Sequence, residues 1–151
     1  LATYRASHCL WNKNRHTMAL FFQNRASEIF GIDIHPAAKI SGGVMMDHAT
    51  GIVIGETAVI ESHVSIFQGV TLGGRGNEIG KRHPNIESGA TIYASSTILG
   101  NITVGHKAII AAGSLVLKDV KNETTVAGIP AKEVNKLNIS NNDWDPGDSS
   151  L

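Results

Sequence analysis

The sequence has a single cysteine, Cys9, among 151 residues. One thiol excludes an internal disulfide framework and is compatible with a reducing cytosol, so we expect a cytoplasmic protein. We interpret Cys9 as a small buried hydrophobe within a helix. No apolar run approaches the roughly 20 residues of a transmembrane helix, and no signal peptide is visible. The chain starts with Leu1 instead of Met, so we treat it as a piece of a longer protein.

The chain also lacks an excess of charge of either sign, because 13 Lys and Arg residues balance 13 Asp and Glu residues. Such a chain has no general attraction for a phosphate backbone or an anionic membrane, so we predict neither nucleic acid nor membrane as a partner. Aromatic residues make up only 5% of the chain, whereas glycine supplies 16 residues. This composition favours many short, closely stacked strands over a core built around large rings.

Residues 1–31 are typical of helices. Trp11, Leu20 and Phe30 lie among Arg, Asn, Gln and Ala residues, with no proline. The polar run 12–15 predicts a break into two helices, and Gly31 is the predicted stop, because glycine accepts the left-handed conformation at a helix end. A helical segment this short cannot bury its own apolar face, so we expect it to pack on another part of the protein.

Over residues 32–135, aliphatic side chains recur every six positions, a period that neither a helix nor a single strand has. They are Ile34, Ile40, Met46, Ile54, Ile60, Ile66, Leu72, Ile86, Ile92, Ile98, Val104, Ile110 and Val116. A small or aliphatic residue follows most of them four positions later: Ala38, Val44, Thr50, Ala58, Val64, Val70, Ala90, Ser96, Ile102, Ala108, Ser114 and Val120. This pattern predicts a β-helix in which three hexapeptides close one triangular coil and neighbouring coils bury each other's inner faces. We expect Gly55, Gly105 and Gly113 to supply turn conformations.

The period breaks twice. The gap between Met46 and Ile54 is eight residues, and the gap between Leu72 and Ile86 is fourteen. The second gap predicts a loop that leaves the coil over residues 73–85, and loops on rigid scaffolds often carry function. Residues 136–151 are rich in Asn, Asp, Ser and Gly and are predicted to form a flexible tail.

Three places could carry chemistry. His48, beside Asp47 at the first break, is a candidate general base, with a surface histidine as the alternative. Asp33 is a candidate to orient an imidazole, or else it caps the entry to the β-helix. Arg82, beside His83, can form a fork on a carboxylate, unless the loop is simply solvated.

Metal binding is the remaining use of the histidines. The β-helical chain contains His35, His48, His63, His83 and His106. None has the close paired spacing of a zinc site, so we predict no metal.

The motifs taken together are more specific than the period. They are Asp33-Ile34-His35-Pro36, Asp47-His48-Ala49-Thr50-Gly51, Gly55-Glu56-Thr57-Ala58-Val59-Ile60, Thr71-Leu72-Gly73-Gly74, Arg82-His83-Pro84 and Ala127-Gly128-Ile129-Pro130-Ala131-Lys132. In this order and spacing, over about residues 10–135, the chain resembles the serine O-acetyltransferase family of hexapeptide-repeat acyltransferases. The resemblance implies a left-handed parallel β-helix, against the usual right-handed crossover preference. It makes residues 1–31 the remnant of a helical N-terminal domain.

The resemblance also implies a mechanism. L-serine and acetyl-CoA bind together, and His48 removes the proton of the serine hydroxyl, which attacks the thioester. Asp33 holds His48, and His83 assists at the reacting centre. Asp47 binds the substrate ammonium and Arg82 its carboxylate. The products are O-acetyl-L-serine and CoA, on the route to cysteine.

The resemblance makes acetyl-CoA a co-substrate, with no tightly bound cofactor. It lies in a groove between adjacent β-helices of a homotrimer. The contacts implied are Gly74, Ala94, Ala112, Gly113 and Lys132. The chain departs from the family at Tyr93, where a glycine is usual, and at Arg75 and Lys81 of the loop, where Thr and Asp are common.

Further partners are implied by the resemblance. L-cysteine is expected as a feedback inhibitor at the serine site. A complete N-terminal domain joins two trimers into a hexamer, and the C-terminal tail of many members binds O-acetylserine sulfhydrylase. This chain ends at Leu151, where those members have isoleucine. The alternatives are another hexapeptide acetyltransferase acting on a sugar or antibiotic hydroxyl, a silent partner-binding β-helix and a zinc carbonic anhydrase.

Overall fold

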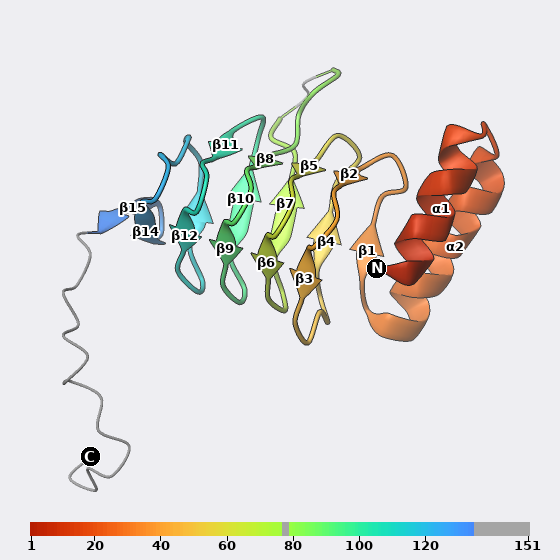
Figure 1. Cartoon of the computed structure of the whole chain (residues 1–151), viewed down its shortest axis with the longest axis horizontal. Coiled ribbons are helices and arrows are strands. Elements are labelled where there is room, and N and C mark those ends of the chain that lie inside the picture. Colours follow the sequence, from red (N-terminus) through yellow and green to blue (C-terminus); the bar gives the residue numbers. More distant parts are fainter. Residues whose placement is uncertain (77–78, 135–151) are drawn as a thin grey trace, which may run out of the picture.

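The computed structural model describes residues 1–76 and 79–134. Two helices precede a row of short strands (Figure 1). The helices are α1 (Ala2–Asn12) and α2 (His16–Phe30). The strands are β1 (Asp33–Ile34), β2 (Lys39–Ile40), β3 (Met45–Met46), β4 (Val53–Ile54), β5 (Val59–Ile60), β6 (Ser65–Ile66), β7 (Thr71–Gly73), β8 (Asn85–Ile86), β9 (Thr91–Ile92), β10 (Thr97–Leu99), β11 (Thr103–Val104), β12 (Ile109–Ile110), β13 (Leu115–Val116), β14 (Thr125–Gly128) and β15 (Ala131–Val134). Neither helix in these ranges is long and apolar enough to cross a membrane.

The helical segment divides where the polar run predicts. The first helix ends at Asn12, and the second ends at Gly31, whose φ of 65° is left-handed and whose N–H donates to the Ser27 carbonyl at 2.9 Å. The prediction for Cys9 is half right, because the residue lies in α1 but its side chain is exposed. The residues that α1 buries are Tyr4 and Ser7, which face the rest of the chain.

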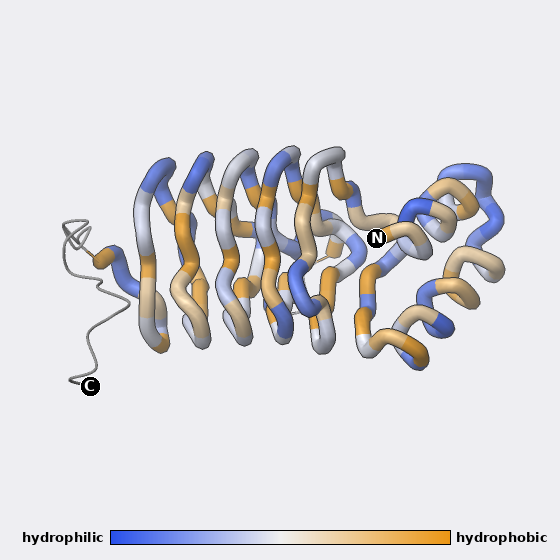
Figure 2. The backbone as a smooth tube through the Cα atoms, turned by 60° about the horizontal axis from the view of Figure 1, so that its bottom comes forward, coloured by the Kyte–Doolittle hydropathy of each residue, from blue (hydrophilic) through white to orange (hydrophobic). Residues whose placement is uncertain are grey.

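The strands form three sheets that run along the row of coils, and all their pairings are parallel except that of β14 with β15. Their orders are β1-β4-β7-β10-β13, β2-β5-β8-β11 and β3-β6-β9-β12-β14-β15. Each strand therefore pairs with its counterpart one coil later; Ile54 pairs with Leu72, and Ile98 with Val116. Figure 2 shows the coils stacked one after another with the helices at one end. The predicted β-helix is confirmed in its period and its stacking.

The core is the column of aliphatic side chains that the period predicts. Ile60, Ile66 and Leu72 are fully buried, and most of the other sixth-position residues are at most 2% exposed. One expected inward residue is wrong, because Thr50 is exposed and Ile52 takes its place with no exposed surface. The turn before β4 holds two extra residues, so the inward position moves two places along the chain.

The three glycines expected in turns serve different purposes. Gly113 has a φ of 68°, as a left-handed turn requires. Gly55 and Gly105 have no such φ; a Cβ on Gly55 would lie 2.0 Å from the His83 ring, and one on Gly105 would lie 2.4 Å from the Asn122 side chain. Each begins a turn, because Ala58 N donates to the Gly55 carbonyl and Ala108 N to the Gly105 carbonyl, but these positions need the space that glycine leaves and not a left-handed φ.

Both ends of the strand stack are covered. At the first coil, Tyr4 donates to the Ala38 carbonyl, Arg5 donates to the carbonyls of Ile40 and Ser41, and His8 Nδ1 lies 2.7 Å from the Pro36 carbonyl. At the other end, β15 turns back to pair antiparallel with β14. These contacts satisfy edge groups that would otherwise be open to another chain. The predicted tail, residues 136–151 with Leu151, lies outside the described residues.

Candidate active site

The turn that joins β3 to β4 is the irregular one, and it carries His48. Left-handed residues are regular at the corners of this coil, but His48 and Ala49 adopt that conformation in succession, with φ of 56° and 61°. The turn is held by its own bonds, from Thr50 N to the His48 carbonyl at 2.8 Å and from His48 N to the Asp47 carboxylate at 3.0 Å. It thus presents the imidazole outward on a fixed backbone.

The imidazole of His48 is open to solvent. Its side chain is 72% exposed, and its Nε2 lies 3.9 Å from Asp47 Oδ2. That separation is too long for a hydrogen bond, so Asp47 is a neighbouring negative charge and not a direct partner of the ring. An exposed imidazole with one free face can approach a substrate hydroxyl.

Asp33 lies at the same corner as His48. Its N–H donates to the Ile52 carbonyl at 2.9 Å, and Gly51 N donates to the Gly31 carbonyl at 2.7 Å, so the two segments run against each other. No hydrogen bond joins Asp33 to His48 within the described residues. Instead Asp33 Oδ1 accepts from Gln23 Nε2 of α2 at 2.6 Å. The role of Asp33 as the orienting carboxylate therefore stays a prediction.

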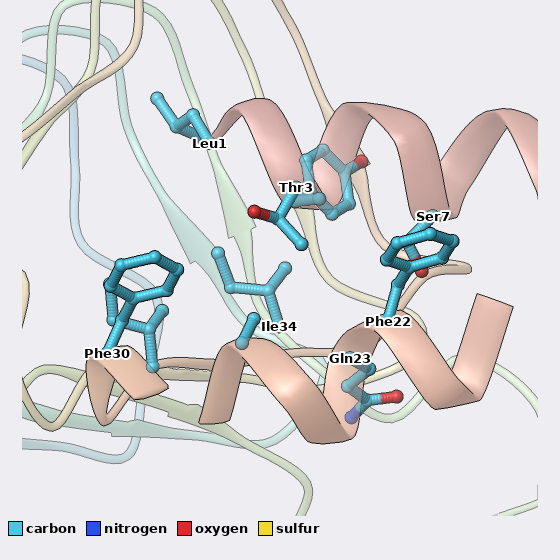
Figure 3. A pocket seen from close by; sticks show the side chains of 10 residues that line it. Leu1, Thr3, Ser7, Phe22, Gln23, Phe30 and Ile34 are labelled. Carbon is cyan, nitrogen blue, oxygen red and sulfur yellow. The ribbon is translucent and has the colours of Figure 1, made fainter. Parts of the chain in front are cut away.

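Gln23 was not among the sequence candidates. Figure 3 shows it on α2 beside a small cavity of about 40 Å³ whose other labelled side chains come from both helices and β1. That volume admits only a few water molecules, so this cavity does not hold a substrate. The contribution of Gln23 is its bond to Asp33, which fixes one carboxylate oxygen from the helical segment.

A second corner carries Arg82 and His83, where the loop that follows β7 returns to the coil. Thr57 organises this return: its Oγ1 accepts from Arg82 N at 3.0 Å and from His83 N at 3.1 Å. Lys81 donates through Nζ to the Thr57 carbonyl. Although the loop is rich in glycine, its exit is bound to the rigid coil by these contacts.

Arg82 has a fixed partner. Its Nη2 lies 2.6 Å from Glu56 Oε2, and this hydrogen bond lowers the pKa of the Glu56 carboxyl. Neither Glu56 nor Thr57 was assigned a role from the sequence, because each lies about 25 residues before its partner along the chain. Only the closure of a coil brings them together.

The His83 ring is packed into the coil. The residue is 8% exposed, and its ring fits against Gly55, where a Cβ would lie 2.0 Å from Nε2. Burial lowers the pKa of His83, and the charges of Arg82 and Lys81 lower it further. Burial also lowers the pKa of nearby His35. A neutral imidazole is therefore favoured at His83.

The two corners do not meet within one chain. The His48 turn leads into β4, whereas His83 lies over Gly55 directly after β4. The pairs Asp47–His48 and Arg82–His83 thus lie at opposite ends of the same strand. Among the described residues, no hydrogen bond or ion pair joins one pair to the other.

The residues expected to contact acetyl-CoA divide between the same corners. Gly74 is exposed and lies beside the His83 ring. Ala94, Ala112 and Gly113 follow the His48 turn up the stack, where Gly113 N donates to the Ala94 carbonyl at 2.9 Å. Lys132 is exposed in β15, at a groove of about 450 Å³. Other basic residues lining that groove are Arg75, Lys118 and Lys121.

Tyr93, which departs from the family pattern, lies directly before Ala94. Its ring stacks on that of Phe67 one coil earlier, with centroids 5.2 Å apart and planes inclined by 18°. Tyr93 is 43% exposed. The aromatic pair therefore lines the outside of the His48 corner, beside the ladder of small residues.

In residues 1–76 and 79–134, no group of three His, Cys, Asp or Glu side chains is placed to hold a metal ion.

Curated proteins with related sequences include serine acetyltransferases from a plant and a bacterium. Serine acetyltransferase 2 of Arabidopsis thaliana is 61% identical over 132 residues, which are 87% of this chain and 41% of the relative. The serine acetyltransferase of Salmonella typhimurium is 59% identical over 136 residues, 90% of this chain and 50% of the relative. This chain thus spans about half the length of these relatives, or less. No protein-family model matches it.

Solved structures agree in fold. A serine acetyltransferase in complex with cysteine has a TM-score of 0.87 at 57% identity, over 88% of this chain and 55% of that one. The serine acetyltransferase from Brucella abortus in complex with coenzyme A has a TM-score of 0.87 at 53% identity, over 88% of this chain and 53% of that one. Soybean serine acetyltransferase complexed with serine has a TM-score of 0.85 at 51% identity, over 87% and 54%. The fold is therefore the left-handed parallel β-helix that the resemblance predicts.

Proposed function

Because this chain is a serine acetyltransferase homologue over 87–90% of its length, we propose that it transfers the acetyl group of acetyl-CoA to the hydroxyl of L-serine. The products are O-acetyl-L-serine and CoA. The observation that carries the proposal is the high identity across the whole β-helix, including both corners with candidate catalytic residues. Related structures with coenzyme A and with serine support the two substrates.

His48 is the general base of this proposal. It accepts the proton of the serine hydroxyl as the hydroxyl oxygen attacks the thioester carbonyl. When the carbon–sulfur bond breaks, the imidazolium returns the proton to the leaving thiolate. A positioned base contributes about 10²- to 10⁴-fold to the rate. Asp33 stabilises the imidazolium, and the bond from Gln23 holds Asp33 in place.

The amino-acid substrate is bound by charge. Asp47, beside the base, takes the ammonium group, and Arg82 takes the carboxylate. Since Glu56 already holds Nη2 of Arg82, the guanidinium is pre-oriented and presents its remaining N–H donors. His83 contacts the same substrates from the Arg82 side.

The complete site forms between copies of the chain. The His48 corner precedes β4 and the His83 corner follows it, so in this proposal the substrate touches one corner from each of two neighbours. A cyclic homotrimer repeats this contact three times without leaving an open interface. Acetyl-CoA then runs along the shared groove, past Gly74 on one copy and Ala94, Ala112 and Gly113 on the other, with Lys132 at the phosphates.

The proposal extends to inhibition by L-cysteine at the serine site and to assembly beyond the trimer. L-cysteine differs from L-serine in one atom and competes for the Asp47 and Arg82 sites; a related structure in complex with cysteine supports this proposal. A hexamer of two trimers and the binding of O-acetylserine sulfhydrylase by the tail belong to the full-length protein.

The test measures release of CoA thiol from acetyl-CoA with and without L-serine. We expect serine-dependent release from the wild type and a loss of about 10²- to 10⁴-fold in His48→Ala. His63→Ala is the matched control, because His63 is also exposed and left-handed at a coil corner. Release that ignores serine, or that survives in His48→Ala, would overturn the proposal.

A further inference from the structure

The contacts of Thr57 with His83 determine which ring nitrogen carries the proton. Thr57 N donates to His83 Nδ1 at 3.2 Å, and Thr57 Oγ1 lies 2.9 Å from the same nitrogen. The backbone N–H groups of Arg82 and His83 both donate to that Oγ1. Thr57 therefore contacts both the Nδ1 side of the ring and the backbone N–H groups of the loop exit.

Counting donors and acceptors fixes the tautomer. A hydroxyl has two lone pairs and one proton. The two lone pairs of Thr57 Oγ1 accept the two backbone N–H groups, so its proton is left for Nδ1. Nδ1 then faces two donors, the hydroxyl and Thr57 N–H, and must act as an acceptor. The proton of the neutral ring therefore resides on Nε2.

The Nε2 edge of the ring lies against two glycines. A Cβ on Gly55 would lie 2.0 Å from Nε2, and a Cβ on Gly74 would lie 3.4 Å from it, so a side chain at either position would crowd this nitrogen. Among the described residues, no protein group accepts a hydrogen bond from Nε2. A buried ring with an unpaired donor beside Gly74 is positioned to serve a ligand.

Most charges around His83 also favour the neutral ring, and only Glu56 raises its pKa. Arg82 and Lys81 belong to its own loop, and Glu56 and His35 face it from the coil. Burial is the largest cause of its lowered pKa, followed by Arg82 and Lys81. Protonating Nδ1 would also set an N–H against the two donors of Thr57. The neutral Nε2–H form is therefore maintained to lower pH than in a free imidazole.

We propose that Thr57 is a positioning residue that holds His83 as the Nε2–H tautomer, so that His83 donates a hydrogen bond to the thioester carbonyl oxygen of the acyl donor. This inference rests on the proposed acetyl transfer. The carbonyl oxygen gains negative charge as the serine oxygen adds, and a donor aimed at that charge stabilises the transition state. His83 is then an oxyanion donor, while His48 at the other corner is the base.

The tautomer is measured first, since it needs no substrate. In the chain labelled with ¹⁵N-histidine, and with the His83 signals assigned from His83→Asn, long-range ¹H–¹⁵N spectra at pH 7 show which nitrogen is protonated. We expect Nε2 protonated and Nδ1 bare in the wild type and in Thr57→Ser. Thr57→Val keeps the backbone N–H donor to Nδ1 but loses the hydroxyl, so we expect a larger share of the Nδ1–H tautomer and a higher titration midpoint than in the wild type. A protonated Nδ1 in the wild type, or an unchanged ring in Thr57→Val, overturns the inference even if acetyl transfer is confirmed.

The kinetic arm tests the role of the donor. Loss of one oxyanion donor lowers kcat by about 10²- to 10³-fold, so we expect a decrease of that size in the kcat of His83→Leu. The kcat of His83→Asn should decrease less, because its amide still donates a hydrogen bond. Thr57→Val should lower kcat by about tenfold or more, and Thr57→Ser should stay near the wild type. Thr17→Val is the matched control, since Thr17 is exposed on α2 and belongs to neither corner. Equal activity in His83→Leu and the wild type overturns the inference.

Discussion

Single residues matter most where two segments approach each other closely. Gly55 is the clearest case, because its missing side chain is the space that the His83 ring occupies. Thr57 and Glu56, which follow directly, then bind the two residues of the loop exit. Three consecutive residues thus form the seat for Arg82 and His83.

We predict that Gly55→Ala displaces His83. The added Cβ would lie 2.0 Å from the ring, and the ring cannot yield without breaking its bonds to Thr57. We expect kcat to fall by about tenfold or more, since small misplacements of catalytic groups are costly. Gly42→Ala is the control, because nothing lies within 4 Å of its added Cβ. Equal activity of the two variants would contradict the assigned role of Gly55.

Acid should destabilise the fold through His83 and His35, two imidazoles whose pKa values burial lowers. Burial lowers the pKa of His83 and His35 below the ordinary 6.5, so below that pH the unfolded chain binds more protons than the folded one. Stability is therefore kept above pH 6.5 and is lost as the pH falls through the lowered folded values. We predict a smaller urea-unfolding free energy at pH 5 than at pH 7, with a flatter slope in His83→Gln. A slope that stays the same in His83→Gln would refute this assignment.

At the residue scale, the sequence predicted what lies within a motif but not what lies across coils. His48, Asp33, Arg82 and His83 could be proposed because their motifs are specific. Gln23, Glu56 and Thr57 carry ordinary side chains whose partners lie 10 to 26 residues away in sequence. No local pattern encodes those contacts, which exist only once the coil closes.

Among the elements, the strands were predicted well and the irregular turn was not. Period six places the inward aliphatic residues of the regular coils, because every two-residue strand except β3 ends with one buried side chain. The period also located the gap before Ile54. It could not show that the two extra residues precede Ile52, since Thr50 and Ile52 both suit a corner. Burial of the larger aliphatic side chain decided the outcome.

The helix α1 stabilises the first coil through its polar side chains. Tyr4 is buried, and its hydroxyl donates to the Ala38 carbonyl. We predict that Tyr4→Phe lowers the free energy of unfolding by about 1–3 kcal/mol, because a buried carbonyl loses its partner. Tyr93→Phe, the change at the other tyrosine, removes a hydroxyl from a partly exposed ring and should cost less than about 0.5 kcal/mol. Urea unfolding of both variants measures the difference, and equal losses would count against this contact.

At the scale of the molecule, the separation of the two corners leads to a complementation test. His48→Ala and His83→Leu should each lose activity alone. Co-expressed or refolded together, they should regain it, because some interfaces then pair an intact His48 corner with an intact His83 corner. Random assortment leaves about a quarter of the sites intact in an equimolar mixture. A mixture no more active than its parts would mean that each site lies within one chain.

Each coil of the β-helix contributes to three sheet faces, so the position of a residue within its coil determines the face on which it lies. Every strand bonds to the strand one full coil away, in a register of 18 residues for the regular coils, as from Ile98 to Val116. Removal of 18 residues, which is one regular coil, shortens the β-helix and leaves each later side chain on its former face. Removal of six rotates everything beyond the cut by a third of a turn, which would carry Ala112 and Gly113 away from the face that presents His48. Removal of whole coils therefore changes the length of the groove, whereas removal of part of a coil changes the face on which the later groove residues lie.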